Sequence, residues 1–471
     1  MKILHISTRL ILGGSQENTV LSCEGQARLG HEVHLTFGPI YGPEGSLLQR
    51  VEEFNRSGAS AHPIRCHTVP HLLRQIGPRA DRLALAELHR LVLDIKPDVV
   101  HTHSSKAGIL GRAAAWKVHV QAPYGHQPPI HHPGPHTLNA DGGKGPIIDG
   151  THPDVDAPTP CLPAVVHTIH GPPFMPVDGG PLHRAKVRLS NWVYARAERY
   201  AARRCHIIVS VADAMTREFL RRSIGRPEQY VTVRSGMEIA PFLNTAPGES
   251  REEVRAALGI APGAFVVGTV ARLAEHKGHD DLLEAFKNLD DPRITLLWIG
   301  DGWWKDRLIQ RALNLHYSVR AETLRPVPIH MVHTMGGVST HNRPKLLLTG
   351  LVPPERIPGL IRAMDVLAHP SYREGLPRTV PQSLLCGVCP VAYDVDGAGE
   401  ICRDMQTGRL VPAGDIAALR DAITWLRDHP AERAAMAARG RAECVDAFSA
   451  ERMVSELEKV YDSAIRLARG S

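Results

Sequence analysis

A carboxylate followed by a glycine turn is the strongest chemical signal in the sequence. Residues 371–389 read S-Y-R-E-G-L-P-R-T-V-P-Q-S-L-L-C-G-V-C, and apolar runs precede and follow this segment. The pattern is typical of a strand, a turn, a short helix and a second strand, with Glu374 at the carboxyl end of the first strand. A carboxylate accepts hydrogen bonds from sugar hydroxyls, and the free N–H groups of a helix start favour phosphate. The segment therefore predicts a site for a ligand that is part sugar and part phosphate.

Two cations follow the first apolar strand of the second half of the chain. The sequence there is V-G-T-V-A-R-L-A-E-H-K-G, with Arg272 after the strand and Lys277 five residues later. Arginine offers a bidentate fork and lysine a point charge, so the pair can hold a diphosphate. Near the start of the chain, Gly13 and Gly14 follow a strand and open a helix, where a backbone can approach a phosphate closely. This pair is not part of a G-x-G-x-x-G motif, so a dinucleotide site is not favoured.

Histidines end two apolar runs in the first half of the chain. The segments read V-V-H-T-H-S-S, with His101 and His103, and V-V-H-T-I-H-G, with His167 and His170. Alternation along a strand places His101 and His103 on the same side. The later histidine of each pair is expected near a cleft at the strand ends, although a histidine in this position is also common as a structural residue.

The segment around Glu374 resembles the signature of the family 4 retaining glycosyltransferases, which have the GT-B fold. That signature has two glutamates separated by seven residues, and here the second position holds Gln382. The second carboxylate of the family holds the ribose of the nucleotide. A glutamine can still hydrogen-bond a hydroxyl, so the resemblance implies ribose binding that is retained but weaker.

The resemblance implies roles for matching residues throughout the chain. The candidate catalytic residues are His170, Arg272, Lys277 and Glu374. The candidate substrate-binding residues are Gly13, Gly14, His103, Gly375, Leu376, Gln382 and Glu400. Among these, His170 matches the family histidine beside the transferred sugar, and Glu400 matches a glutamate that is either structural or lines the nucleotide site.

No metal and no cofactor are expected, and the nucleotide sugar is expected as a substrate. The sequence Asp394-Val-Asp396 mimics a metal-binding motif of a different glycosyltransferase fold, but in this context it is expected to form only a turn. Five histidines lie in the proline-rich segment 123–163. They have few acidic companions and no regular helical spacing, so a zinc site is the less favoured interpretation.

Short strands alternate with helical stretches in two series, which is the pattern of parallel, doubly wound sheets. The strands predicted in the two series are 2–7, 33–37, 98–103, 164–170, 207–211 and 231–234, then 265–271, 294–299, 365–369 and 390–393. The prediction is an α/β fold with two Rossmann-like domains, 1–235 and 240–449, facing a cleft. The resemblance implies that a last helix, 450–471, returns to the first domain. The segments 123–163 and 313–347 do not fit the pattern and are interpreted as insertions.

Composition favours an enzyme that works in the cytoplasm. The chain has 471 residues, and it contains no apolar run long enough to span a membrane and no evident export signal. Its excess positive charge is concentrated in 182–206, where aromatic residues are interleaved with arginines. Such a helix can contact an anionic membrane surface, here the inner face of the membrane, or it can be a solvated face. A nucleic-acid partner is not expected, because no recognition motif accompanies the charge.

The predicted function is that of a retaining, metal-independent glycosyltransferase. It would move a sugar from a nucleotide-sugar donor to a glycan or lipid-linked acceptor, and the family context implies the assembly of a cell-surface polysaccharide or glycolipid. The enzyme alternatives are a nucleotide-sugar epimerase or a glycan phosphorylase of the same two-domain plan. From another class, a catalytically idle nucleotide-sugar-binding protein remains open, because Gln382 departs from the family pattern.

Overall fold

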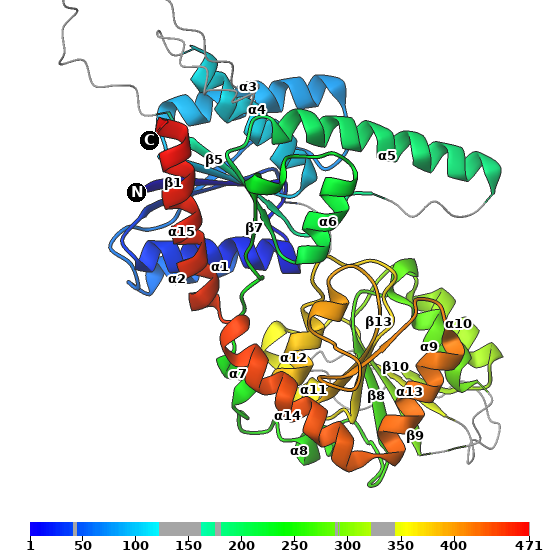
Figure 1. Ribbon diagram of the computed structural model, residues 1–471. Coiled ribbons are helices and arrows are strands. Elements are labelled where there is room, and N and C mark those ends of the chain that lie inside the picture. Colours follow the sequence, from blue (N-terminus) through cyan, green and yellow to red (C-terminus); the bar gives the residue numbers. More distant parts are fainter. Residues whose placement is uncertain are drawn as a thin grey trace, which may run out of the picture.

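The computed structural model describes residues 1–40, 45–121, 162–174, 180–287, 291, 293–321 and 344–470 (Figure 1). Two seven-stranded parallel sheets form the centres of two α/β units. Their strand orders are β3-β2-β1-β4-β5-β6-β7 and β10-β11-β9-β8-β12-β13-β14. The prediction of two Rossmann-like doubly wound domains is confirmed. The strand order reverses at the centre of each sheet, between β1 and β4 or between β8 and β12, and ligands bind at such points beyond the carboxyl ends of the strands.

The first unit is built from the first half of the chain. Its strands are β1 (Lys2–Ser7), β2 (Glu32–Phe37), β3 (Arg65–Thr68), β4 (Val99–His103), β5 (Ala164–Ile169), β6 (Ile207–Ser210) and β7 (Tyr230–Thr232). Its helices are α1 (Gly14–Arg28), α2 (Leu48–Arg56), α3 (Pro78–Ile95), α4 (Ser105–Gln121), α5 (Pro181–Ala202) and α6 (Asp213–Arg221), with a 3₁₀ turn η1 (Pro227–Gln229). The central strands are buried because helices cover both faces of the sheet, and they carry buried histidines among their apolar residues.

The second unit repeats this plan. Its strands are β8 (Phe265–Val270), β9 (Ile294–Ile299), β10 (Ser318–Ala321), β11 (Lys345–Leu348), β12 (Val366–His369), β13 (Cys389–Tyr393) and β14 (Arg409–Val411). Its helices are α7 (Ala240–Leu243), α8 (Arg251–Ala257), α9 (His279–Phe286), α10 (Lys305–Asn314), α11 (Ile357–Arg362), α12 (Thr379–Leu385), α13 (Ile416–Asp428) and α14 (Pro430–Ala447). Three 3₁₀ turns complete it: η2 (Glu275–Lys277), η3 (Pro354–Arg356) and η4 (Ala398–Glu400).

The interpretation of 313–347 as an insertion is wrong at both ends of the segment. Helix α10 runs to Asn314, and β10 and β11 pair with each other and with β9 inside the second sheet. Strand β10 lies at the edge of the sheet and is only partly buried, so it lacks the apolar run that marks a central strand. The residues between the two strands, 322–343, lie outside the described part of the chain. The same holds for 122–161, which includes most of the other predicted insertion.

The chain crosses between the two units at two adjacent places. Met237 N–H donates to Phe448 O at 2.9 Å, and Ala450 N–H donates to Met237 O at 3.0 Å. The last helix, α15 (Ala450–Arg469), then runs along the first unit beside α1 (Figure 1). Its Leu457 and Tyr461 are buried in a cluster with Ile3 of β1. The second crossing therefore returns the end of the chain to the first sheet.

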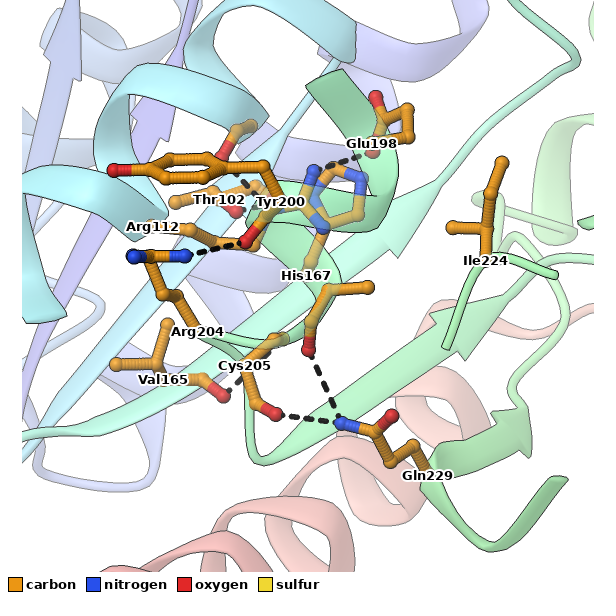
Figure 2. A network of polar contacts seen from close by, with 12 residues as sticks. Thr102, Arg112, Val165, His167, Glu198, Tyr200, Arg204, Cys205, Ile224 and Gln229 are labelled. Carbon is orange, nitrogen blue, oxygen red and sulfur yellow. Dashed lines mark hydrogen bonds and ion pairs between the residues drawn. The ribbon is translucent and has the colours of Figure 1, made fainter. Parts of the chain in front are cut away.

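Two further features concern surfaces rather than the core. Within the described ranges, none of the helices combines the length and the apolar character that crossing a bilayer requires. Helix α5 projects from the first unit toward one side of the molecule (Figure 1). Its inner face is fixed by a buried ion pair between Glu198 and Arg112 of α4, with an N–O distance of 2.6 Å (Figure 2).

Candidate active site

Glu374 lies in the loop that follows β12, and its carboxylate is held as an anion. Its Oε1 forms an ion pair with the ammonium of Lys277 and lies 3.2 Å from Nε2 of His369. Burial alone would raise the pKa of Glu374, but Lys277 and His369 outweigh it and hold this pKa well below its ordinary value. The predicted residues Lys277 and Glu374 are thus brought together, although 97 positions separate them in the sequence.

The turn after β13 holds the Glu374 loop in place through a hydrogen bond. The N–H of Glu374 donates to Oδ2 of Asp396 at 2.7 Å, and Asp396 has a φ of 48°. Burial, opposed by the hydrogen bond from Glu374 N–H, raises the pKa of Asp396. The Asp394-Val-Asp396 sequence is therefore a turn that supports the loop. The absence of a metal from this site stays a prediction.

Gly375 brings the loop into direct contact with the first unit. A Cβ at this position would clash with the carbonyl oxygen of His170 and would lie 2.9 Å from Cα of Gly171. Only a glycine permits this approach of two backbones. Leu376, the next residue, is buried and packs in the apolar core, so only its backbone is placed for a ligand. Glu374 and His170 are consequently neighbours across the boundary between the two units.

Cations gather around the Glu374 loop. Lys277 lies in η2, and Arg272 lies just before it on the surface, with its guanidinium 5.8 Å from the ring centroid of Trp303. Burial lowers the pKa of His276, and the positive charges of Lys277, Arg373 and Arg272 lower it further, while Glu374 opposes them. Three cations and the Glu374 carboxylate thus act on the same side chain, His276.

Arg378 connects the glycine loop of the first unit to the second unit. Its Nη1 donates to Gly14 O at 2.9 Å, and its Nη2 lies 3.0 Å from the carboxylate of Glu17. A Cβ at Gly14 would lie 2.9 Å from Cδ of Arg378, so the two residues are in close contact. Arg378 was not predicted as a site residue. The sequence feature that could have indicated it is a cation directly before a short helix. Gln382 lies one turn further along α12, where its N–H donates to Arg378 O at 3.2 Å.

The two histidines predicted at strand ends are adjacent in space. Nε2 of His170 lies 3.1 Å from Nδ1 of His103. Burial and then the charge of Arg378 lower the pKa of His170 to about 3, so its ring is neutral at physiological pH. The Nδ1 atom of His170 is buried and has no hydrogen-bond partner among the described residues. Among the described residues, this atom therefore lacks the hydrogen bond that buried polar groups normally have.

Glu400 makes an interdomain contact in this structure. Its Oε1 accepts a hydrogen bond from Ala214 N–H at 2.8 Å, at the start of α6, and its Oε2 lies 3.9 Å from Arg234. Two roles were considered for Glu400, one structural and one at the nucleotide site. These contacts with α6 and Arg234 correspond to the structural role. Its other predicted role, lining the nucleotide site, stays a prediction.

Segments in both halves of the chain match known protein families. A family model described as a glycosyl transferase 4-like domain matches residues 13–147, and one described as glycosyl transferases group 1 matches residues 264–429. The UDP-Gal:alpha-D-GlcNAc-diphosphoundecaprenol alpha-1,3-galactosyltransferase of Escherichia coli is 23% identical over 468 residues, covering 98% of this chain and 96% of that protein. The 2-deoxystreptamine N-acetyl-D-glucosaminyltransferase of Streptomyces fradiae is 28% identical over 250 residues, which is 51% of this chain and 53% of that protein.

Solved structures share the fold over nearly the whole chain. Anabaena Alr3699/HepE in complex with UDP-glucose superposes with a TM-score of 0.66 at 19% identity, covering 98% of this chain and 100% of that chain. Sucrose-phosphate synthase from Thermosynechococcus elongatus superposes with a TM-score of 0.67 at 16% identity, covering 100% of both chains. The two-domain α/β architecture is therefore shared with sugar-transferring enzymes of the GT-B type.

Proposed function

The chain belongs to the group 1 glycosyltransferases, and we propose that it is a retaining, metal-independent enzyme that uses a nucleotide-sugar donor. The acceptor is a glycan or a lipid-linked glycan used in the assembly of a cell-surface polysaccharide or glycolipid. One observation carries the proposal: Glu374, which is paired with Lys277, directly precedes Gly375, and the backbone of Gly375 packs against that of His170 across the domain boundary. The Escherichia coli relative, whose name specifies a diphosphoundecaprenol acceptor, supports the lipid-linked acceptor. The UDP-glucose complex of the Anabaena protein supports a nucleotide-sugar donor.

The residues of the site have complementary roles in this reaction. Arg272, Lys277 and the glycine loop at 13–14 offset the charge of the departing diphosphate, so no metal is needed for that purpose. Glu374 accepts hydrogen bonds from sugar hydroxyls, with help from the backbone amides that follow it. His170 orients the sugar or the acceptor. The acceptor hydroxyl attacks from the face of the leaving group, and a phosphate oxygen of that group takes its proton.

Turnover of a panel of nucleotide sugars tests this function. With uridine, guanosine and adenosine diphosphate sugars and a lipid-linked acceptor, one donor is expected to release its nucleotide, and the rate is expected to be unchanged in a strong chelator. The expectation rests on the charges of Arg272 and Lys277, which are proposed to offset the departing diphosphate. Loss of activity in chelator that manganese restores would refute metal independence. Binding without release would favour an idle binding protein, and conversion of the donor to an isomer would favour an epimerase.

Gln382→Glu restores the family pattern at the ribose position. A charge-assisted hydrogen bond is roughly twice as strong as a neutral one. The variant is therefore expected to lower the Michaelis constant for the donor a few-fold, a gain of about 1 kcal/mol. Titration of the free nucleoside diphosphate measures the same gain without catalysis. A tenfold weaker donor affinity would mean that position 382 has another role.

Helix α5 carries an exposed apolar stripe on the face opposite its buried ion pair. Leu182 is 90% exposed, and Leu189, Trp192, Val193 and Tyr200 are exposed along the same side of the helix. Arg196 stacks over Trp192, and Arg204 stacks over Tyr200 with its Cζ 3.6 Å from the ring centroid (Figure 2). Apolar and aromatic side chains flanked by arginines suit the interface of an anionic bilayer. The second partner of the enzyme is thus the anionic inner face of the membrane, which also presents the lipid-linked acceptor.

Sedimentation with vesicles tests this contact. Wild-type protein is expected to bind vesicles of phosphatidylglycerol and phosphatidylcholine, and to bind less at high salt. Changing Leu189 and Trp192 together to serine is expected to weaken binding by about tenfold or more, because each loses apolar burial of about 1.5–3 kcal/mol. Leu93→Ser on α3, at a position 43% exposed, is the matched control. Equal binding by both variants would rule out α5 as the membrane contact.

A further inference from the structure

A continuous chain of side-chain hydrogen bonds runs from the candidate active site through the interior of the first unit to helix α15. It begins at His170, which bonds to His103, and Nε2 of His103 lies 3.0 Å from Nδ1 of His5. Nε2 of His5 lies 2.7 Å from Oε1 of Gln26, on helix α1. The amide nitrogen of Gln26 then donates to the hydroxyl of Tyr461 at 2.9 Å. His5, Gln26 and Tyr461 have no part in the mechanism described above.

The direction of each hydrogen bond in this series follows from the Gln26 carboxamide, which faces His5. Burial lowers the pKa of His5 to about 4 and that of His103 well below its ordinary value, so their rings are neutral. A neutral imidazole has one N–H donor and one acceptor nitrogen. Because the carboxamide oxygen of Gln26 can only accept, His5 carries its proton on Nε2 and accepts through Nδ1. His103 then donates through Nε2 and accepts through Nδ1, so His170 must donate through Nε2.

The remaining nitrogen of His170 is therefore a bare acceptor. We infer that Gln26, His5 and His103 are positioning residues that hold His170 in the tautomer with an unprotonated Nδ1, so that His170 accepts a hydrogen bond from a substrate hydroxyl. The inference rests on the proposed function only for the statement that the substrate bears hydroxyl groups. Nδ1 is the buried, unpartnered atom found at the domain boundary. A histidine without such a chain would use either tautomer.

Tyr461 contacts the nitrogen end of the Gln26 amide. Its hydroxyl accepts from Gln26, so its own hydrogen is given to Nδ1 of His101, which lies 2.7 Å away. Nε2 of His101 in turn lies 2.7 Å from Oγ1 of Thr168. If the amide were reversed, every bond from Tyr461 to His170 would reverse with it, and Nδ1 of His170 would become a donor. The orientation of the Gln26 amide, which lies between His5 and Tyr461 of α15, thus determines what His170 offers to a substrate.

The same histidines also have a spacing that would suit a metal ion. One ligand atom from each of His5, His101 and His103 lies within 4.8 Å of the others. However, every ring nitrogen of these three residues already has a hydrogen-bond partner. A metal would have to displace Gln26, Tyr461 or a histidine from an otherwise satisfied chain, which costs the bonds of buried polar groups. The hydrogen-bonded arrangement is therefore the one assigned.

Nitrogen NMR of histidine-labelled protein tests the assignment without requiring activity. Two-bond proton–nitrogen correlations distinguish the two tautomers, and the signals of His170 are identified by their loss in His170→Gln. The wild type is expected to show a proton on Nε2 of His170 and none on Nδ1. Gln26→Met removes the acceptor that anchors the chain and is expected to give mixed or reversed tautomers at His170. Tyr461→Phe is a second route to the same result, because it frees the amide of Gln26 to reverse.

Ser22→Ala is the matched control for these variants. Ser22 lies one turn before Gln26 on α1, is fully buried and contacts α15, but it does not take part in the series of hydrogen bonds that leads to His170. This variant is expected to leave the His170 tautomer unchanged. A proton on Nδ1 of His170 in the wild type would overturn the inference, and so would an unchanged tautomer in both Gln26→Met and Tyr461→Phe. Stoichiometric zinc in the purified protein would overturn it in favour of a metal site.

Donor analogues test the consequence for recognition. Replacing one sugar hydroxyl at a time by fluorine keeps an acceptor and removes a donor. Wild-type enzyme is expected to lose about tenfold in kcat/KM for the fluorinated position that faces His170. In Gln26→Met this discrimination is expected to shrink to a few-fold, whereas Ser22→Ala keeps it. Unchanged discrimination in Gln26→Met would overturn the inference, while absence of turnover with every donor would instead contradict the proposed function and leave the tautomer measurement valid.

Discussion

Gly375→Ala is expected to lower kcat/KM by about a hundredfold or more while the melting temperature stays at the wild-type value. The added Cβ would clash with the carbonyl of His170 and would lie 2.9 Å from Cα of Gly171. Gly375 belongs to the second unit and His170 to the first, so the clash is relieved when the units move apart rather than when either unfolds. A displacement of about 1 Å between catalytic groups is sufficient for a loss of this size. Steady-state kinetics and thermal unfolding measure the two effects separately.

The other side of the same contact supplies a control. A Cβ at Gly171 would lie 3.6 Å from Gly375 N, which is an ordinary van der Waals distance. Gly171→Ala is therefore expected to keep near-normal activity. If Gly375→Ala were as active as Gly171→Ala, the approach of the Glu374 loop to His170 would not be required for catalysis. Small-angle scattering of the two variants would show whether the alanine at 375 favours a more open arrangement.

Lys277→Met is expected to reduce kcat by about a hundredfold, or about 3 kcal/mol of transition-state stabilisation. Methionine keeps much of the length of the side chain but removes the charge that offsets the departing diphosphate. It also leaves Glu374, whose side chain is only 15% exposed, without its ion-pair partner. An unpaired carboxylate beside the diphosphate position repels it, so the affinity for free nucleoside diphosphate is expected to fall as well.

Lys287→Met is the comparison for this variant. Lys287 also forms an ion pair with a glutamate, Glu284, but on an exposed helix surface three residues away. Exposed pairs of this kind contribute little, so the change is expected to leave kcat and the melting temperature nearly unchanged. A rate for Lys277→Met close to that of Lys287→Met would refute the role of Lys277 at the diphosphate.

The central part of the fold follows from local sequence patterns. Strands such as β1 and β9 are largely apolar segments of a length that suits a buried parallel strand, and both were predicted at their observed bounds. Edge strands carry a weaker signal because one side has no neighbour and the side chains are partly exposed. Strand β3, with the sequence R-C-H-T, and β14, with R-L-V, were missed for this reason. The same limit explains why β10 was assigned to an insertion.

The sequence by itself determined which residue types stand at the strand ends, because short motifs such as E-G-L-P and R-L-A-E-H-K are local. Only the tertiary structure decided what those residues contact. The ion pair of Lys277 with Glu374 and the contact of Arg378 with Gly14 join positions that are far apart in the chain. Gln26 carried no motif, and its position beside His5 depends on how α1 packs against α15. Hydrogen-bond direction is a property of a whole connected network, so no single segment of the sequence specifies it.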